Sequence, residues 1–507
     1  MLGYSILQLS KKYAARMNLP IHLERNSSES LQDQLFEQLR VMIVTGKLKP
    51  NTRVIGTRFL AEQTGVSRTT VLLAYERLIA EGYLETRPAV GTYVCTDLPD
   101  DPIVKEEVGL SQEHILRQSS LRPPVFYGRC ATLPPASEAF PFDFRDSPSV
   151  SPLLLKSWLR TSQRMLEYYS DGFMRYPPPA GLEPLRSAIA DWLAARRGLA
   201  VSRDQVIVVA GCQQAYNIAG RLLLREGDRV VVENRAPTNV LHLFESMGAK
   251  LVHAPVDEEG IDVASLPDGD VTLACLTPSH QNPLGSTLSL ERRGQIIEWA
   301  RRSRTYLIED DCSSEFRYQG SAPSPLLSID PYGLVFYVGT FSKTLGAGLR
   351  QGYLIVPPEF IDTAVALKSL LDNGCPWLEQ MILADFISSG EYDIHLRRLR
   401  KTYLERRDLL IDALTRQFGA CHLVGTEGGT HLTWMLPAGL PPAYAICTAA
   451  RQRGVFIEAL PDGLADFSMT ESGLMLGYSM LNDRKLHEGI EHLANVLETL
   501  KTTSLKA

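Results

Sequence analysis

Apolar positions along this chain follow two patterns, and the change from one to the other marks two kinds of structure. Near the amino terminus an apolar residue recurs every four positions from Leu31 to Ile43, which predicts an amphipathic helix that ends near Gly46. Ser28 or Ser30 is the candidate N-cap. From about residue 142 to residue 500, helical stretches alternate with short apolar runs, as in a layered α/β domain with a mostly parallel sheet. The chain is therefore predicted to join a small helical module to a large α/β domain.

A second and a third helix are predicted directly after the first. Residues 57–64 form the second helix, Gly65 makes a tight turn, and Ser67 caps the third helix, which is the plan of a helix-turn-helix. Residues 81–86 and 91–94 then have the pattern of two short strands that form a wing. The first turn of the third helix carries hydroxyl groups and a guanidinium, which suit contacts with phosphates and base edges. A DNA-binding module is favoured, and a small helical dimerisation domain is the alternative.

Five apolar runs in the large domain predict buried strands, because β-branched and aromatic residues dominate them. The runs are Gln205 to Val209, Arg229 to Val232, Val271 to Leu276, Thr305 to Ile308 and Leu334 to Val338. Polar clusters follow directly after several of these runs. Open parallel sheets bind ligands beyond the carboxyl ends of their strands, so these clusters are candidate ligand sites.

Four polar clusters carry the candidate chemistry of the large domain. Their residues are Gly211, Cys212 and Gln213 after the first run, Asn282 after the third, Asp310 and Cys312 after the fourth, and Ser342, Lys343 and Arg350 after the fifth. A partly desolvated lysine can form a Schiff base, and loop amides with an arginine can hold a phosphate. A carboxylate keeps a pyridine nitrogen protonated, and a neutral amide can donate to a phenolic oxygen. Pyridoxal phosphate is a single ligand that requires all four groups.

Chain length, net charge and cysteine spacing limit the classes of protein to which this chain could belong. A chain of 507 residues predicts two or three domains, and its net charge of −6 means that any DNA binding must come from a local patch. Eight cysteines without a Cys-x-x-Cys pair or a Cys/His cluster favour free thiols over a disulfide framework or a zinc site, so no metal is expected. No apolar run is long enough for a signal peptide or a membrane span, which predicts a soluble cytoplasmic protein.

Proline and acidic residues predict a linker between the two folded parts. Residues 96–141 contain seven prolines and an acidic start, and only the portion from Ser111 to Ser119 has the pattern of a short helix. The linker either transmits geometry between the domains or has no regulatory consequence. The predicted boundaries are an amino-terminal extension at 1–28, a DNA-binding module at 29–95, the linker at 96–141 and a cofactor domain at 142–507.

The amino-terminal module closely resembles the winged helix-turn-helix of GntR-type transcriptional regulators. The resemblance is carried by residues 46–50, 57–61, 65–71, 75–84 and 91–92. It implies DNA contacts from Arg58, Ser67, Arg68, Thr69, Thr70 and Gly91. Ile55-Gly56 stands where the family usually has Pro-Ser, a departure that concerns the start of the second helix and leaves the contact residues in place.

Residues 142 to 500 strongly resemble the fold-type I aminotransferases through the four clusters and their order. The resemblance implies an α/β fold in which a large domain with a mostly parallel sheet is followed by a smaller C-terminal α/β subdomain. It assigns Lys343 to a Schiff base with pyridoxal phosphate, Asp310 to the pyridine nitrogen and Asn282 to the phenolic oxygen. It assigns the phosphate to Gly211, Cys212, Gln213, Ser342 and Arg350.

The union of the two halves resembles the MocR/GabR subfamily of GntR regulators. Residues 379–398 and 403–408 carry the same resemblance, which covers nearly the whole chain. It implies a domain-swapped, head-to-tail homodimer on a double-stranded DNA operator. It also implies a regulator that senses a small amine, an amino-acid-like effector or pyridoxal phosphate itself through Schiff-base exchange at Lys343.

Three departures from the family pattern lie around the predicted cofactor. Cys312 stands where the family usually has a tyrosine that helps to bind the phenolic oxygen, and a thiol is a weaker donor. Residues 235–237, Arg-Ala-Pro, replace the family's Pro-Gly-Tyr, which removes an aromatic ring. Met475 stands where some members and true aminotransferases place an arginine for the substrate carboxylate. Sensing is therefore favoured over net turnover, with a transamination half-reaction as the residual activity.

Three alternatives stay open on sequence alone. A catalytically active aminotransferase could carry the winged module as a dimerisation accessory. A DNA-binding regulator that has lost pyridoxal phosphate is conceivable from Cys312 and Pro237, but the lysine, acid, asparagine and arginine of the four clusters are intact. Family drift, with other residues covering the altered roles, accounts equally well for the three departures.

Overall fold

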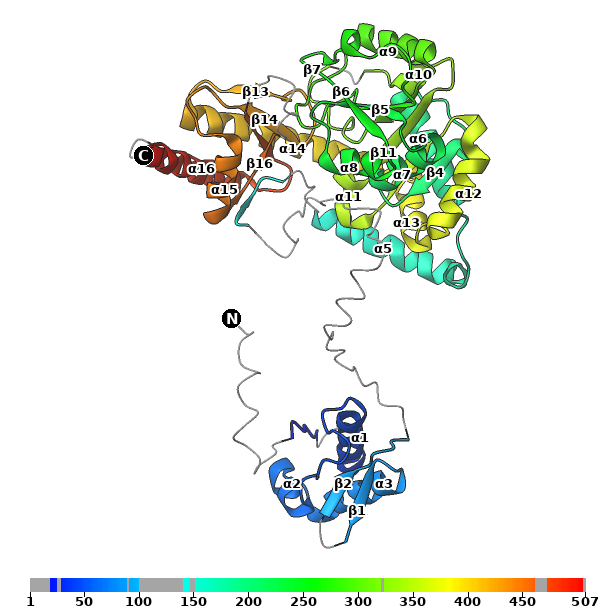
Figure 1. Ribbon diagram of the computed structural model, residues 1–507, viewed down its shortest axis with the longest axis vertical. Helices are drawn as coiled ribbons and strands as arrows, with labels where there is room; N and C mark the ends of the chain where they lie inside the picture. The colour runs from blue at the N-terminus through cyan, green and yellow to red at the C-terminus, as the bar shows by residue number, and fades with distance from the viewer. Residues whose placement is uncertain are drawn as a thin grey trace. The chain divides into compact units, whose positions relative to one another are not determined.

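The structure is a computed structural model that describes residues 19–24, 29–88, 91–99, 140–145, 151–320, 323–460 and 472–504. Figure 1 shows its helices and strands. The chain divides into two compact units, Met1–Pro123 and Pro124–Ala507, and each is described by itself. Most of the predicted linker lies outside the described residues, including the short helix expected between Ser111 and Ser119, as do residues 1–18 of the predicted extension.

In the described part of the first unit, helices precede a two-stranded hairpin, as the apolar pattern predicts. The elements are α1 (Leu31–Val44), α2 (Thr57–Thr64), α3 (Arg68–Ala80), β1 (Leu84–Arg87) and β2 (Gly91–Val94). Ser30 caps α1, because its Oγ accepts the N–H of Asp33 at 3.1 Å. Leu35 and Leu39 on α1 pack with Val71 on α3 in one buried core. The four-residue repeat therefore faces the interior.

Two residues fix the turn between α2 and α3. Gly65 ends α2 in the left-handed conformation at φ 68°, which glycine adopts without a Cβ clash. Ser67 starts the next helix, because its Oγ accepts the N–H of Thr70 at 3.0 Å. The start of α2 is less firmly capped, since its N-cap is Gly56, which has no side chain to accept a hydrogen bond. The wing strands β1 and β2 then pair antiparallel.

A seven-stranded sheet forms the centre of the second unit. In spatial order its strands are β4 (Val206–Val209), β12 (Gly352–Ile355), β11 (Val335–Thr340), β10 (Tyr306–Asp310), β9 (Leu273–Leu276), β5 (Arg229–Glu233) and β6 (Lys250–Ala254). The strands from β11 to β6 run parallel, while β12 is antiparallel to both of its neighbours. The predicted mostly parallel sheet is confirmed, and each predicted run overlaps one of its strands.

Helices cover both faces of this sheet. On one face lie α7 (Cys212–Leu223), α8 (Thr238–Ser246) and α12 (Ile361–Asp372), and on the other lie α6 (Glu183–Arg197), α9 (Leu290–Ser303) and α13 (Trp377–Ser388). Strands buried on both faces read as continuous apolar runs, which is why these runs show no alternation of polar and apolar residues. Among the described residues, no helix is both long and apolar enough to cross a membrane.

A smaller antiparallel sheet with its own helices occupies the carboxyl-terminal part of the second unit (Figure 1). Its elements are β13 (His422–Val424), β14 (His431–Met435), β17 (Gly473–Gly477) and β16 (Glu458–Ala459), with α14 (Glu391–Phe418), α15 (Ala443–Gln452) and α16 (Asp483–Ser504). Tyr403, Trp434 and Leu476 are buried in the core of this subdomain. It is the smaller α/β subdomain that the fold resemblance implies.

Candidate functional site

Lys343 emerges directly after a buried strand, as the sequence predicts. Strand β11 ends at Thr340, and the short helix α11 (Ser342–Leu345) follows. The Nζ of Lys343 donates a hydrogen bond to the Oγ of Ser313 at 2.7 Å. Ser313 belongs to the turn after β10, which is the parallel neighbour of β11. The lysine is thus held at the carboxyl ends of two adjacent strands.

Asp310 is the last residue of β10 and is bonded from two sides. Its Oδ1 accepts the N–H of Cys312 at 3.0 Å, and its Oδ2 accepts the hydroxyl of Tyr216 on α7. Burial raises the pKa of Asp310, while these hydrogen bonds and the charge of Lys343 oppose that rise. A cationic nitrogen bound beside this carboxyl group would favour its ionised form.

The amino end of α7 and Arg350 come together for a topological reason. Strand β12 runs antiparallel to β4, so Gly352 at the start of β12 pairs with Val209 at the end of β4. Arg350 lies just before β12, and its Nη2 donates to the carbonyl oxygen of Ala210 at 2.5 Å. Gly211 has a φ of 89°, which favours glycine, and a Cβ there would lie 3.0 Å from Arg350 Nη2. Helix-start amides beside a guanidinium form an anion-binding set.

These groups fit pyridoxal phosphate. The cofactor needs an amine, a carboxylate and an anion-binding cup, and the structure places all three around the ends of β4, β10 and β11. The close approach of the Arg350 guanidinium to Gly211 is part of that cup. The chemistry of the donor set and the shape of the cup therefore agree with the ligand that the sequence predicts.

Asn282 lies on the wall of a cavity of about 760 Å³ that the small subdomain also lines. Arg235, Arg451 and Glu458 contribute both signs of charge to this wall. Met475 lines it as well, and on the small sheet it pairs with Glu458 across β17 and β16. The wall of the cavity beside Asn282 therefore carries charges of both signs.

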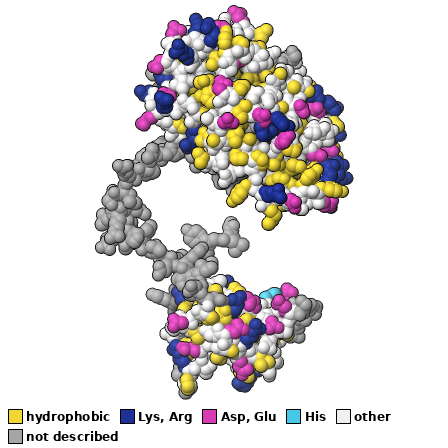
Figure 2. All heavy atoms as spheres, turned by 90° about the vertical axis from the view of Figure 1, so that its right-hand side faces the viewer, with side chains coloured by type: hydrophobic (Ala, Val, Ile, Leu, Met, Phe, Trp, Pro, Cys, Tyr) yellow, Lys and Arg dark blue, Asp and Glu magenta, His cyan; other side chains and the backbone are white. Residues whose placement is uncertain are grey.

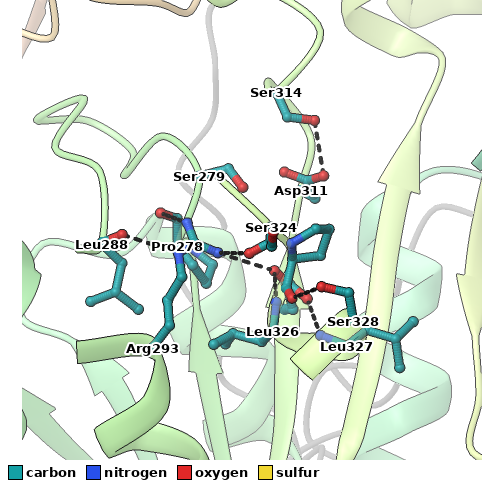
Figure 3. A network of polar contacts seen from close by, with 12 residues as sticks. Pro278, Ser279, Leu288, Arg293, Asp311, Ser314, Ser324, Leu326, Leu327 and Ser328 are labelled. Carbon is teal, nitrogen blue, oxygen red and sulfur yellow. Dashed lines mark hydrogen bonds and ion pairs between the residues drawn. The ribbon is translucent and has the colours of Figure 1, made fainter. Parts of the chain in front are cut away.

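A buried polar network holds the loops that follow β9 and β10 (Figure 3). Arg293 on α9 is fully buried and donates to three carbonyl oxygens, those of Leu288 at 3.0 Å, Ser324 at 2.8 Å and Pro278 at 2.7 Å. Glu309 lies 3.9 Å from the Arg293 guanidinium and accepts the N–H groups of residues 326 and 327. Burial and the charge of Asp311 raise the pKa of Glu309 to about 7.

Asp311 belongs to the same framework and has a structural role. The structure places Asp311 2.8 Å from the buried guanidinium of Arg197. Its Oδ2 also accepts the hydroxyl of Ser314 at 2.9 Å. Burial disfavours the Asp311 carboxylate, but Arg197 and the hydrogen bonds hold its pKa below the usual range. The turn that carries Cys312 and Ser313 is thereby fixed.

The candidate DNA contacts face solvent on the first unit. Ser67, Arg68 and Thr69 are exposed at the start of α3, and Arg58 is exposed on α2. Arg58 and Arg68 line a shallow hollow of about 460 Å³. Gly91 starts β2, and a Cβ there would lie 2.9 Å from Nε of Arg53, an arginine that the sequence analysis does not single out.

The structure gathers most of the predicted cofactor residues and adds others. Direct contacts or charge link six of them, which are Lys343, Asp310, Cys312, Cys212, Gly211 and Arg350. Ser342 adjoins Lys343 at the start of α11, and Asn282 faces the cavity. The exposed side chain of Gln213 donates to the carbonyl oxygen of Asn239 at 3.1 Å.

Sequence reasoning missed two partners in this cluster. Tyr216 bonds Asp310, and Ser313 bonds Lys343. Tyr216 stands four residues after Cys212, on the same face of α7, so helical spacing could have indicated it. Ser313 carries no such signal, because its contact depends on the register between β10 and β11.

Comparison with known families matches both halves of the chain. Residues 148–452 match the family described as aminotransferase class I and II. Residues 31–94 match the family described as bacterial regulatory proteins, gntR family.

Individual relatives match either most of the chain or a large part of it. The chain is 34% identical to the probable rhizopine catabolism regulatory protein MocR of Rhizobium meliloti, over 95% of this chain and 96% of that protein. It is 30% identical to the HTH-type pyridoxine biosynthesis transcriptional regulator PdxR of Corynebacterium glutamicum, over 87% of this chain and 91% of that protein. Among solved structures, the α-aminoadipate aminotransferase LysN of Thermus thermophilus matches with a TM-score of 0.65 and 26% identity, over 71% of this chain and 93% of that one.

Proposed function

The chain belongs to the MocR-type subfamily of GntR regulators, which joins a DNA-binding winged helix to an aminotransferase class I and II domain, and from this membership we propose that it senses an amine at Lys343. It is a transcriptional regulator, and pyridoxal phosphate is its cofactor. The observation that carries the proposal is the cluster of Lys343, Ser313 and Asp310 at adjacent strand ends.

Each residue of the cluster has a proposed part in holding the cofactor. Lys343 would meet the aldehyde, Asp310 the pyridine nitrogen, Asn282 and Cys312 the phenolic oxygen, and Gly211, Cys212, Gln213, Ser342 and Arg350 the phosphate. Bound there, pyridoxal phosphate supplies an aldehyde that condenses reversibly with primary amines. Ser313 accepts a hydrogen bond from the Lys343 amine, and Tyr216 keeps the Asp310 carboxyl group oriented. The chain itself thus positions the amine and the acid.

The cavity beside Asn282 supports an effector that is a small amine or amino-acid-like molecule. Its wall contains Arg235 and Arg451 as cations and Glu458 as an anion. Met475 cannot make the bidentate grip on a carboxylate that an arginine makes. An acidic group on the effector would therefore bind Arg235 or Arg451. Pyridoxal phosphate itself, arriving at an empty cup, is the other effector that this chemistry allows.

One titration distinguishes an effector sensor from an enzyme with net turnover. A panel of primary amines and amino acids is added to the cofactor-loaded protein, and the visible spectrum and the affinity for operator DNA are followed together. We expect at least one amine to change both quantities without continuing consumption. Steady conversion of an amino donor and a keto acid, with no change in DNA affinity, would establish the aminotransferase alternative instead.

The first turn of α3 is the proposed reader of a double-stranded operator. Ser67, Arg68, Thr69 and Thr70 lie at a helix start, where amides, hydroxyls and a guanidinium suit phosphates and base edges. Arg58 and Gly91 would add contacts from α2 and from the wing. A regulator has to reach DNA, so the proposal includes a cytoplasmic location.

Replacing Arg68 by alanine is expected to weaken operator binding, because a cation that contacts a phosphate or a base is lost. The slope of log K against log salt concentration should fall in magnitude by about 1. The measurement is fluorescence anisotropy over a range of salt concentrations. Arg40→Ala is the control, since Arg40 lies on α1 and pairs with Glu37 at 2.6 Å. Unchanged affinity of Arg68→Ala at every salt concentration would remove α3 as the reading helix.

A homodimer is proposed from an apolar surface on the second unit. Helix α5 (Pro152–Tyr168) exposes Leu155 and Leu159, and Phe173 and Met174 follow it. Figure 2 shows hydrophobic side chains gathered along the lower edge of the larger unit, where Figure 1 places α5. Such a patch marks an interaction surface, and a second copy of the chain is the proposed partner. The domain-swapped, head-to-tail arrangement of the family is part of this proposal.

Leu159→Glu is expected to shift the protein from dimer to monomer, because it places a charge in the buried part of the proposed interface. Leu290→Glu is the matched control, since Leu290 on α9 is 69% exposed and Leu159 is 70% exposed. Sedimentation velocity at several concentrations measures both variants. If Leu159→Glu and Leu290→Glu sediment alike as dimers, the interface lies elsewhere.

A further inference from the structure

Two cysteines of the cofactor cluster lie unusually close together. The Sγ atoms of Cys212 and Cys312 are 2.8 Å apart. Other sulfur contacts in the described chain are longer, such as Cys375 Sγ to the carbonyl oxygen of Val208 at 3.7 Å and Cys421 Sγ to that of Leu414 at 3.9 Å. A disulfide needs a sulfur separation of about 2.05 Å, so only a small movement separates the two thiols from a bond.

Both cysteines are positioned by rigid elements. Cys212 is the first residue of α7, directly after β4 and Gly211. Cys312 follows the end of β10, where its N–H is bonded to Asp310 and where the neighbouring Asp311 is paired with Arg197. The sheet fixes these two chain segments although the residues are far apart in sequence. Each of the two residues keeps part of its surface exposed to solvent.

We propose that Cys212 and Cys312 are a redox-active pair that forms a reversible disulfide when the protein meets a hydroperoxide. The Cys212 thiolate attacks the peroxide oxygen, the O–O bond breaks, and an alcohol or water leaves, which gives a sulfenic acid on Cys212. The Cys312 sulfur then attacks the Cys212 sulfur, its proton is lost, and water leaves. Two thiols are oxidised and one hydroperoxide is reduced to an alcohol, or to water, with one further water released.

The order of attack follows from the surroundings of the two thiols. The contact with Cys212, then burial and the charge of Asp310, hold the pKa of the Cys312 thiol well above its ordinary value. Cys212 stands at the positive end of the α7 dipole, which stabilises negative charge developing on its sulfur. Cys212 is therefore the sulfur that meets the oxidant, and Cys312 resolves the product.

The bond would change what the site offers to its cofactor. A disulfide sulfur carries no hydrogen, so oxidation removes the S–H group of Cys312 that is proposed to donate to the phenolic oxygen. This consequence rests on the proposed function, whereas the bond itself rests only on the position of the two sulfur atoms. Weaker retention of pyridoxal phosphate in the oxidised protein is the expected result.

The test uses the full chain, which contains eight cysteines. The protein is treated with one equivalent of hydrogen peroxide, free thiols are alkylated, and peptides are mapped by mass spectrometry. We expect two fewer alkylated thiols, one peptide pair joining Cys212 to Cys312, and full recovery after dithiothreitol. Cofactor retention is read separately from the visible spectrum, so that loss of the bond and failure of the cofactor assignment are distinguishable.

Two serine variants complete the test. In Cys212→Ser, peroxide is expected to produce no disulfide that includes Cys312. The number of alkylated thiols should then be the same with and without peroxide, apart from any oxidation of single cysteines outside the pair. Cys447→Ser, at a partly exposed cysteine outside the cluster, is expected to keep the linked peptide. The proposal is overturned if wild-type protein keeps both thiols while other cysteines oxidise, or if the linked peptide contains a different pair. The wild-type peptide map decides even if a variant does not fold.

Discussion

Replacing Lys343 by alanine is expected to abolish covalent attachment of pyridoxal phosphate to the protein. An alanine has no amine to condense with the aldehyde, and the charge that acts on Asp310 is lost with it. Borohydride treatment of cofactor-loaded wild-type protein should leave one modified peptide, the one that contains Lys343. The same treatment of Lys343→Ala should leave none, and its visible absorbance should be that of loosely held cofactor.

Two further variants separate the amine from its charge. Lys343→Arg keeps a cation near Asp310 but offers no amine that condenses at neutral pH, so it should also lack the modified peptide. Lys401→Ala is the control, because Lys401 on α14 is 79% exposed and lies 4.0 Å from Glu405. A modified peptide that persists in Lys343→Ala would show that another lysine holds the cofactor. The assignment of the whole cluster would then be wrong.

Local sequence signals were sufficient to predict which residues lie at the ends of the strands. Lys343 and Asp310 directly follow apolar runs, and a run that is buried on both faces has few alternative structures. Arg350 was already a candidate phosphate ligand from its place after the fifth apolar run, but its contact with Ala210 depends on the reversed direction of β12. Sequence periodicity does not report strand direction.

Contacts between distant segments were beyond the sequence argument. The spacing of the cysteines argues against a zinc motif, but it cannot show that Cys212 and Cys312 face each other. Cys212 follows β4 and Cys312 follows β10, and their approach depends on the order of these strands in the sheet. Gln213 shows the opposite limit. The family resemblance assigns Gln213 to the phosphate, but the resemblance does not give the direction of its side chain. A helix turns successive side chains by about 100°, and the side-chain amide of Gln213 bonds Asn239.

Replacing Arg293 by methionine is expected to destabilise the second unit by about 3–5 kcal/mol, which is the usual cost of breaking a buried ion pair by removing one partner. Three carbonyl oxygens would each lose the hydrogen bond from Arg293, and the carboxyl group of Glu309 would lose its only cation within 4 Å among the described residues. Chemical denaturation followed by circular dichroism measures the loss. The first unit provides an internal reference if its transition is separate.

Arg301→Met tests whether burial is the cause, because Arg301 lies on the same helix but is 47% exposed and pairs with Glu298 at 2.9 Å. An exposed pair contributes at most about 1 kcal/mol, so the two variants should differ severalfold in their effect. The double variant Arg293→Met, Glu309→Leu should recover part of the loss, since no buried charge remains unpaired. Equal losses for Arg293→Met and Arg301→Met would mean that the network adds no stability.

The carbonyl groups of Pro278 and Leu288 bracket the loop that carries Asn282, so a loss of stability in Arg293→Met should also weaken cofactor retention.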